Sequence, residues 1–251
     1  MNILVSVKRV PLTGGKIVLT DDERAISTRH LGFTISPHEE CAAEEAVRLI
    51  EQHGGSSTVL TLGPPEAEEQ LRDVMAIGVD RAIHLVTDDQ EWDPQATAGA
   101  IVDAVRAQEE PYDLLLFGNE SADAGNYQVA IRVAHALGLP CVTGVKAIAL
   151  ADGGLRCEQE VPGGRDVYVV PMPAVVTVKE GLNLPRYPSV PGRLRAKRKP
   201  VEASNPTRPE PQLEMLRLVL PVGSGKQVQV LGQGPEAAPA VVAVLEELGV
   251  I

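Results

Sequence analysis

The sequence predicts an α/β fold in which a parallel sheet carries helices on both faces. Short, β-branched apolar runs alternate with amphipathic stretches through the first 140 residues. Strands that are apolar throughout are typical of a parallel sheet that is buried on both sides. The 251 residues can bury a substantial core as one large domain, or as one domain with an appendage. The expected architecture is therefore Rossmann-like.

Four strands and four helices are expected to alternate in this part of the chain. The strands are predicted at residues 3–7, 57–62, 82–86 and 113–117. The helices are predicted at residues 37–53, 65–77, 94–108 and about 126–137. Because strand and helix alternate, consecutive strands are expected to run parallel and to be joined by crossover helices.

The helix at residues 37–53 has the clearest signals. Ser36 is the expected N-cap, Pro37 takes the first helical position, and Glu39 completes a capping box. Two glycines at 54 and 55 end the helix. The apolar positions share one face, which is expected to leave four residues to solvent. These residues are Glu44, Glu45, Arg48 and Glu51.

The chain changes character after residue 140. Strand-like segments are predicted at residues 144–151, 155–161, 167–170 and 174–178, with glycine pairs at two of the turns between them. We interpret these segments as antiparallel additions to the edge of the sheet. They complete a predicted nucleotide-binding domain of residues 1–180.

Residues 181–200 are predicted to form a partner-recognition loop and a basic segment. Three prolines occur between residues 183 and 192, and proline removes a backbone donor and fixes φ. We therefore expect neither a helix nor a central strand there. A long, stiff loop with an apolar tip usually contacts another molecule. The basic residues at 193–199 either steer an acidic partner or form a solvated face.

Residues 201–251 are predicted to form an extended C-terminal arm. A strand is possible at residues 215–219, and a terminal helix is expected at residues 235–248. The apolar residues of this helix have little local core of their own. We therefore expect the arm to pack on another surface, such as that of a partner subunit.

Composition excludes several classes of function. The net charge of −11 argues against nucleic acid as the main ligand, because phosphate backbones require a basic face. No apolar run approaches the length of a membrane span, and the first residues form a strand instead of a signal peptide. The cysteines at 41, 141 and 157 show no CxxC spacing. Unpaired thiols of this kind indicate a reducing, cytoplasmic location.

Two segments are expected to meet at a ligand crevice. In an open parallel sheet, ligands bind beyond the carboxyl ends of the strands near the switch point. One is residues 6–11, at the end of the first strand, and the other is residues 118–129, which connect the fourth strand to a helix. Free amides at that helix start favour a phosphate, and Asp123 or Asn126 caps the helix or meets a ribose. The alternative is an ordinary connecting loop with a capping aspartate.

No metal site and no catalytic residue are expected. The sequence His38-Glu39-Glu40-Cys41 holds metal-type residues, but successive helical positions point in different directions. No motif pairs a nucleophile with a base of its own.

The order and spacing of several motifs resemble the beta subunit of electron transfer flavoprotein over essentially the whole chain. The matching segments are VSVKRV (5–10), SPHEECAAEEAVRL (36–49), LGP (62–64), the loop from Gly118, MPAVVTV (172–178) and LNLPRYPSVPGRLRAKRK (182–199). The last two segments are the most specific. Each motif is weak alone, but together they identify the family.

The resemblance implies a heterodimer with an alpha subunit that holds most of a shared FAD, and a buried AMP in the beta subunit. The implied AMP contacts are Ser6, Ser36, Pro37, His38, Glu39, Leu62, Gly118, Asn119, Ala122, Asp123, Asn126, Tyr127, Gln128 and Val129. Thr13 falls at a position that faces the flavin. Glu160 falls where the family has an acid that orients the flavin domain.

The proline-rich segment resembles the family's recognition loop for partner dehydrogenases. Its anchor falls on Val190, where leucine is usual, and the missing methylene is worth about 0.8 kcal/mol of burial. The resemblance implies partner contacts for Pro185, Arg186, Tyr187, Val190, Pro191, Arg193, Arg195 and Arg198.

The implied function is single-electron transfer from flavin dehydrogenases, such as the acyl-CoA dehydrogenases of fatty acid oxidation, to a quinone oxidoreductase. The redox chemistry would belong to the cofactor, so the chain is expected to be a carrier and not a catalyst with its own substrate. One alternative is a bifurcating, NADH-oxidising flavoprotein subunit with a second FAD. Another is a stand-alone nucleotide-binding regulatory module.

Overall fold

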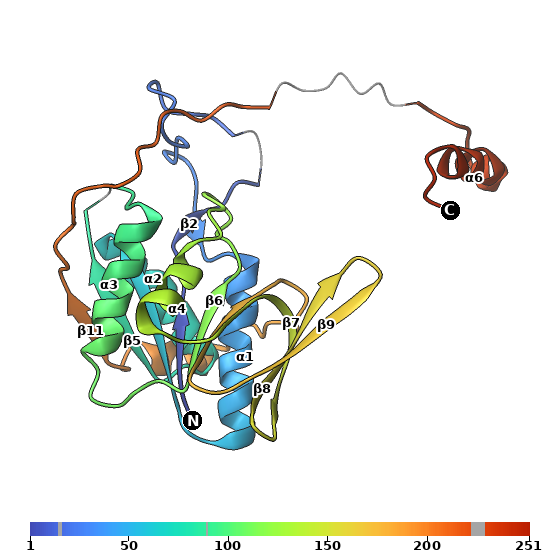
Figure 1. The fold of residues 1–251 in the computed structure, drawn as a ribbon. Coiled ribbons are helices and arrows are strands. Elements are labelled where there is room, and N and C mark those ends of the chain that lie inside the picture. The colour runs from blue at the N-terminus through green and yellow to red at the C-terminus, as the bar shows by residue number, and fades with distance from the viewer. Residues whose placement is uncertain (15–16, 89, 222–228) are drawn as a thin grey trace.

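The computed structural model describes residues 1–14, 17–88, 90–221 and 229–251. Within these ranges, nine strands form one sheet in the order β11-β5-β4-β1-β6-β10-β7-β8-β9 (Figure 1). The strands are β1 (Asn2–Ser6), β4 (Ser56–Gly63), β5 (Arg81–Val86), β6 (Leu114–Gly118), β7 (Cys141–Ala151), β8 (Gly154–Val161), β9 (Gly164–Val170), β10 (Ala174–Val178) and β11 (Val201–Ser204). Neighbours from β11 to β7 pair in parallel, and β8 and β9 add an antiparallel ribbon.

Helices cover both faces of this sheet, so the predicted Rossmann-like α/β fold is confirmed. The helices are α1 (Pro37–His53), α2 (Glu68–Ile77), α3 (Pro94–Arg106), α4 (Val129–Leu137), α5 (Val190–Ala196) and α6 (Ala238–Glu247), with short 3₁₀ turns η1 (Pro65–Ala67) and η2 (Pro235–Ala237). One apolar core lies between the sheet and α1, α2 and α5. A second core lies between the opposite face and α3 and α4. In the described ranges, no helix is both long and apolar enough to cross a lipid bilayer.

The position of β10 corrects one prediction. Residues 174–178 were expected to be an antiparallel strand at the sheet edge, but β10 lies between β6 and β7 and is parallel to both. All five of its residues are buried. Such an unbroken apolar run requires cover on both faces, and a central parallel strand provides that cover. The prediction was wrong because it placed β10 by its order in the chain.

The proline-rich region also differs from the prediction. Residues 190–196 form α5, because Ser189 caps this helix by accepting a hydrogen bond from Gly192 N at 3.1 Å. Pro191 lies in the first turn, where its missing N–H donor costs nothing. Directly after α5, β11 pairs with β5 and extends the sheet on the side opposite to β9.

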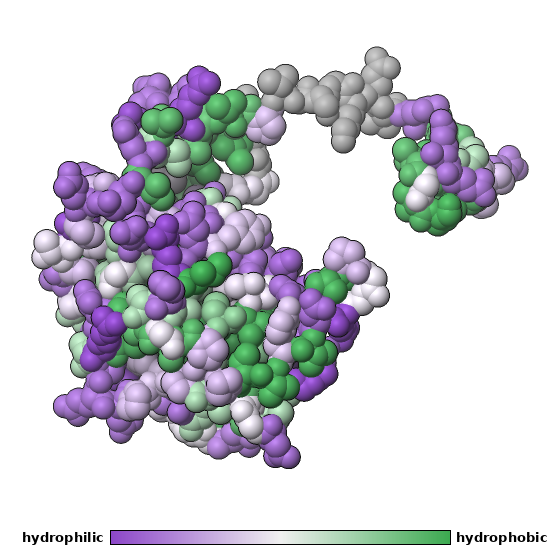
Figure 2. All heavy atoms as spheres, in the orientation of Figure 1, coloured by the Kyte–Doolittle hydropathy of each residue, from purple (hydrophilic) through white to green (hydrophobic). Residues whose placement is uncertain are grey.

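The C-terminal arm contains α6 as expected but no strand at residues 215–219, so that prediction is wrong. A hydrogen bond of 2.7 Å from Leu218 N to Glu23 O connects this segment to the part of the chain between β2 and β3. Figure 1 shows α6 apart from the sheet, and Figure 2 shows hydrophobic atoms along one side of it and hydrophilic atoms on the other. Val241 and Val242 on α6 and Leu248 directly after it are exposed apolar residues.

Two short strands precede α1. They are β2 (Val10–Pro11) and β3 (Phe33–Thr34), which pair antiparallel outside the main sheet. The guanidinium of Arg9 lies 3.3 Å from the centre of the Phe33 ring, a cation–π contact that joins the two ends of this hairpin. Thr13 follows β2 by two residues and is exposed.

Candidate functional site

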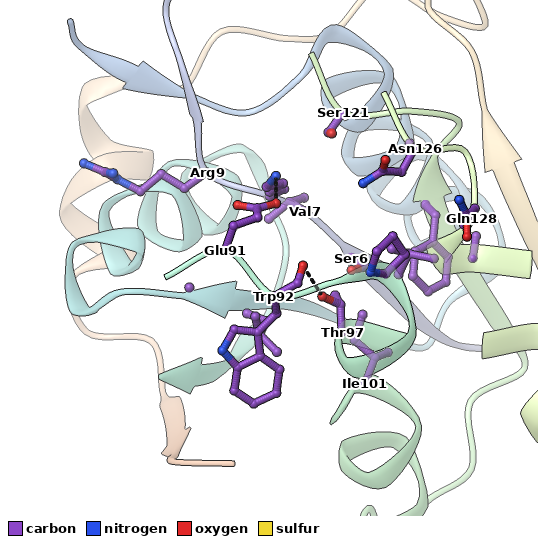
Figure 3. A pocket seen from close by; sticks show the side chains of 18 of the residues that line it. Ser6, Val7, Arg9, Glu91, Trp92, Thr97, Ile101, Ser121, Asn126 and Gln128 are labelled. Atoms are coloured by element: carbon purple, nitrogen blue, oxygen red, sulfur yellow. Dashed lines mark hydrogen bonds and ion pairs between the residues drawn. The ribbon is translucent and has the colours of Figure 1, made fainter. Parts of the chain in front are cut away.

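The main pocket lies at the point where the chain order reverses across the sheet. From β1 the chain proceeds to β4 and β5 on one side, and β6 then pairs with the other side of β1. The pocket opens at the carboxyl ends of these strands, which is where this topology places ligands (Figure 3). Nine of the implied AMP contacts line it, namely Ser6, Glu39, Leu62, Gly118, Asn119, Asn126, Tyr127, Gln128 and Val129.

The remaining five implied contacts line a second, shallower hollow on the other side of the β6–α4 connection. These residues are Ser36, Pro37, His38, Ala122 and Asp123. The connection itself separates the two hollows. Its place is fixed by a hydrogen bond from Ala122 N to Ser36 Oγ of 2.9 Å. The structure thus divides the predicted set between two adjoining hollows at the start of α1. No group of three His, Cys, Asp or Glu side chains within the described residues is arranged to hold a metal ion.

Glu39 is a buried acid at the base of the main pocket. Its two carboxylate oxygens accept hydrogen bonds from Lys8 N and Ser36 N, each at 2.9 Å. Burial raises the pKa of Glu39 to about 8, although these two bonds act in the opposite direction. Gly118 makes room for this side chain, because a Cβ at position 118 would lie 2.7 Å from Glu39 Cγ.

Lys8 is a pocket residue that the sequence reasoning placed in the segment at the crevice but did not select as a contact. Its ammonium lies 2.6 Å from a Glu91 oxygen and 2.7 Å from an Asp123 oxygen, so it connects the β5–α3 and β6–α4 segments. Burial lowers the pKa of Lys8, but the two carboxylates outweigh burial and raise it above its ordinary value. Burial likewise raises the pKa of Asp123, but Lys8 and several hydrogen bonds hold it below its usual range. The signal that could have identified it is its position, because Lys8 directly follows the strand predicted at residues 3–7.

The β6–α4 connection ends in a strained turn. Tyr127 has a φ of 57°, a left-handed conformation that is uncommon for residues other than glycine. Helix α4 begins at Val129 and not at residue 126 as predicted, because residues 126–128 form this turn. Their side chains and amides therefore line the pocket instead of the first helical turn. Figure 3 shows Asn126 and Gln128 on the same side of the pocket as Ser6 and Ser121.

The segment at residues 183–187 is fixed to α1 by buried acids. Arg186 donates to Glu44 from its backbone N, its Nε and its Nη2, at 2.9 to 3.1 Å, and its two Nη atoms also bond Glu51. Hydrogen bonds to Glu51 and Glu44 raise the pKa of Arg186. Asn183 Nδ2 bonds the Glu45 carboxylate at 2.9 Å.

These contacts correct a prediction about α1. Glu44 and Glu45 were expected to face solvent, but their side chains are only 6 % and 7 % exposed. They are buried because the 183–187 segment covers them. Arg48 and Glu51 are exposed as predicted. The signal that was missed lies in residues 183–187. Asn183 and Arg186 pair with these two acids and so allow them to be buried.

Around the 183–187 segment, several apolar side chains are exposed. Leu184 is 91 % exposed and Tyr187 is 96 % exposed. Val190 and Leu194 lie one helical turn apart on α5 and are 73 % and 60 % exposed. Arg186 holds the backbone that bears Leu184 and Tyr187, and α5 packs on α2, so this surface is preformed. We call these four residues the exposed apolar surface.

The other implied contacts differ in their surroundings. Arg193 pairs with Asp73 at 2.8 Å, whereas Arg195 and Arg198 extend into solvent beside the exposed apolar surface. Pro185 and Pro191 lie within this stretch of the chain, between Leu184 and Leu194. Glu160 lies on the β8–β9 ribbon and pairs with Lys146 at 3.2 Å. Thr13 is exposed, beyond β2 and outside both hollows.

The sheet topology and the pocket place the chain in the class of doubly wound α/β proteins with a ligand crevice at the switch point. Residues 25–209 match the family model described as "Electron transfer flavoprotein domain". The chain therefore belongs to the electron transfer flavoprotein family. Its relatives identify the subunit: three of them are named "Electron transfer flavoprotein subunit beta".

These three relatives match most of the chain. The protein of Bacillus subtilis (strain 168) is 34 % identical over 98 % of this chain and 97 % of its own length. The protein of Syntrophomonas wolfei is 35 % identical over 92 % of this chain and 90 % of its own length. The protein of Mycobacterium tuberculosis (strain H37Rv) is 33 % identical over 80 % of this chain and 77 % of its own length. The chain is thus an electron transfer flavoprotein subunit of the beta type.

Proposed function

We propose that this beta subunit forms a heterodimer with an alpha subunit and carries single electrons through a shared FAD. The electrons would come from flavin dehydrogenases, such as acyl-CoA dehydrogenases, and would pass to a membrane-associated quinone oxidoreductase. The carrier itself would be cytoplasmic. The FAD, held mostly by the alpha subunit, supplies the one-electron chemistry when bound. The observation that carries the proposal is the similarity to beta subunits over nearly the whole chain.

The C-terminal arm supports a partner subunit. In the described part of the arm, α6 packs mainly against η2, and its residues Val241 and Val242 are exposed. An apolar helix of this kind is stable only when another surface covers it. The β8–β9 ribbon carries further apolar residues, with Val167 50 % and Val169 56 % exposed. Both features fit a large interface with an alpha subunit.

The main pocket fits a nucleotide such as AMP. Its lining combines apolar walls with backbone amides and polar side chains at the β6–α4 connection, as ligand pockets commonly do. Asn126 and Gln128 would bond the polar groups of the nucleotide, and Ser6 and Leu62 would contact its flat face. The amides beside Val129 lie at the start of α4, where a phosphate is favoured. In this role the nucleotide fills the pocket and takes no part in electron transfer.

The exposed apolar surface supports a docking role. Val190 and Leu194 would enter an apolar cleft of a dehydrogenase, and Arg195 and Arg198 would face an acidic rim. Because the protein as a whole has a net charge of −11, an acidic partner would be attracted only at such a local positive patch and would be oriented by it.

The decisive experiment is to co-express the chain with its alpha subunit, purify the complex and identify the nucleotides released on denaturation. One FAD and one AMP per heterodimer would support the carrier. Two FAD would favour the bifurcating, NADH-oxidising alternative. A chain that purifies alone as a stable, flavin-free monomer or homodimer would favour a regulatory module and overturn the proposal.

A further inference from the structure

Lys8 is the feature of the pocket that the proposed function leaves unused. Its side chain is 28 % exposed, and its ammonium lies between the carboxylates of Glu91 and Asp123. The two carboxylates differ in environment, because Asp123 is 19 % exposed whereas Glu91 is 66 % exposed. Figure 3 shows the Glu91 carboxylate directed into the pocket, with a dashed line to its partner beside Val7.

The charges around the pocket make Lys8 the candidate cation for a phosphate. Among the described residues that line the pocket, the cations are Lys8 and Arg9. The guanidinium of Arg9 stacks on Phe33, and Figure 3 shows its side chain directed away from Asn126 and Gln128. The lining also contains several acids, namely Glu39, Asp88, Glu91 and Glu120. The amides at the start of α4 favour a phosphate, and a phosphate dianion among these acids gains further from a facing positive charge.

We propose that Lys8 Nζ binds the phosphate of the nucleotide, and that this phosphate takes the place of Glu91 at the ammonium. The inference rests on the nucleotide pocket of the proposed function and names the residue that recognises its phosphate. Glu91 is the partner that yields, because a carboxylate exposed to this degree regains its hydration when it moves away. Asp123 stays, because it is largely buried and also accepts from Ala124 N at 2.7 Å.

This exchange makes the pocket selective for phosphorylated ligands. Adenosine has no group that replaces the Glu91 carboxylate, so it leaves the Lys8–Glu91 pair intact. AMP supplies a stronger anion and keeps Lys8 paired. The same exchange ends the ion pair through which Lys8 contacts the β5–α3 segment, which Arg208 still holds through a hydrogen bond to Glu91 O.

The test is isothermal titration calorimetry of the heterodimer, dialysed free of nucleotide, with AMP and adenosine as the two probes. K8M should weaken the binding of AMP by about ten- to a hundredfold, which is the loss expected for a charged hydrogen bond. The affinity for adenosine should not change. E91Q should raise the affinity for AMP by about two- to fivefold. It removes a carboxylate that competes for Lys8, and an exposed ion pair contributes about this much to an equilibrium. K197M and E109Q repeat the same charge changes at exposed positions outside the pocket and should alter neither ligand.

Each outcome decides the proposal. An unchanged ratio of AMP to adenosine affinity in K8M would overturn it, as would a weaker AMP affinity in E91Q. If K8M fails to fold, E91Q still decides, since Glu91 is exposed and its replacement spares the core. If the native heterodimer contains FAD but binds neither AMP nor adenosine, the nucleotide pocket and this inference fail together while the carrier function stands.

Discussion

Replacing Arg186 with glutamine tests whether the buried acids of α1 hold the docking segment. The change removes the guanidinium that bonds Glu44 and Glu51, and it leaves Glu44 under the segment with a side chain only 6 % exposed. Breaking a fully buried pair costs about 3–5 kcal/mol. Arg186 is 37 % exposed and Glu51 is 56 % exposed, so solvent screening reduces that range. We expect a loss of about 2–3 kcal/mol in the free energy of unfolding.

The loss should be visible in thermal melts of the purified heterodimer. For a chain of this length, about 1 kcal/mol shifts the melting temperature by about 2–4 °C, so R186Q should melt roughly 4–12 °C lower. R195Q is the matched control, because Arg195 is exposed on the neighbouring helix and should change stability by less than about 0.5 kcal/mol. The double variant E44Q/R186Q should recover part of the loss, because no buried charge then remains unpaired.

The same variant should weaken docking. Without Arg186 the 183–187 segment is no longer held on α1, so Tyr187 and Leu184 lose their fixed positions. The KM of a dehydrogenase for the heterodimer should rise more than kcat falls, because the flavin is untouched. Equal melting temperatures for R186Q and R195Q would refute the idea that the Glu44–Arg186 pair anchors the segment.

Three further outcomes are expected. V190D places a charge where an apolar anchor is proposed, so transfer from the dehydrogenase should slow at least tenfold while the flavin absorption spectrum stays the same; V190L should transfer as well as the native protein or better. G118A forces a Cβ to within 2.7 Å of Glu39 Cγ and should destabilise the protein by about 1–3 kcal/mol in denaturant titrations, whereas G99A, with open space around its Cβ on α3, should not. Glu39 has a pKa of about 8 in the folded protein and 4.5 as its ordinary value. Between these pH values the unfolded chain releases a proton that the folded chain keeps, so stability should fall by up to about 1.4 kcal/mol per pH unit. E39Q should lack this slope, and a slope equal to that of the native protein would contradict the assignment.

The sequence predicted the parts of the fold that depend on local patterns. Helix α1 begins and ends at the predicted residues, because its cap, its first-turn proline and its terminal glycines are all local signals. The place of β10 was not predictable in this way. Its apolar sequence indicates that both faces of the strand are covered, but it does not indicate which strands lie beside it. The pairing with β6 and β7 depends on the whole sheet.

The candidate site shows the same division. Ser6 and the residues after Gly118 were found because the carboxyl ends of neighbouring strands meet in any such sheet. Lys8 was missed because its role depends on Glu91 and Asp123, which lie 83 and 115 positions further along the chain. Burial of Glu44 was missed for the same reason, since its partner Arg186 is 142 positions away.

Helix α1 joins the two proposed functional regions of this protein. Its first turn carries Glu39, which lines the nucleotide pocket and bonds the backbone of Lys8. Five residues later, Glu44 bonds Arg186 and thereby holds the segment that bears part of the exposed apolar surface. A rigid helix rises 1.5 Å per residue, so these two attachment points are about 7.5 Å apart along one element. Because the core fixes α1 against β1 and β6, a partner that docks on Val190 binds a surface whose position is set by the same helix that frames the pocket.

Loss of the nucleotide should therefore lower the stability of α1 and the docking segment together. Hydrogen exchange of residues 37–51 and 183–194, with and without AMP, would measure that link. Protection that changes at the pocket alone would show that the two regions are independent.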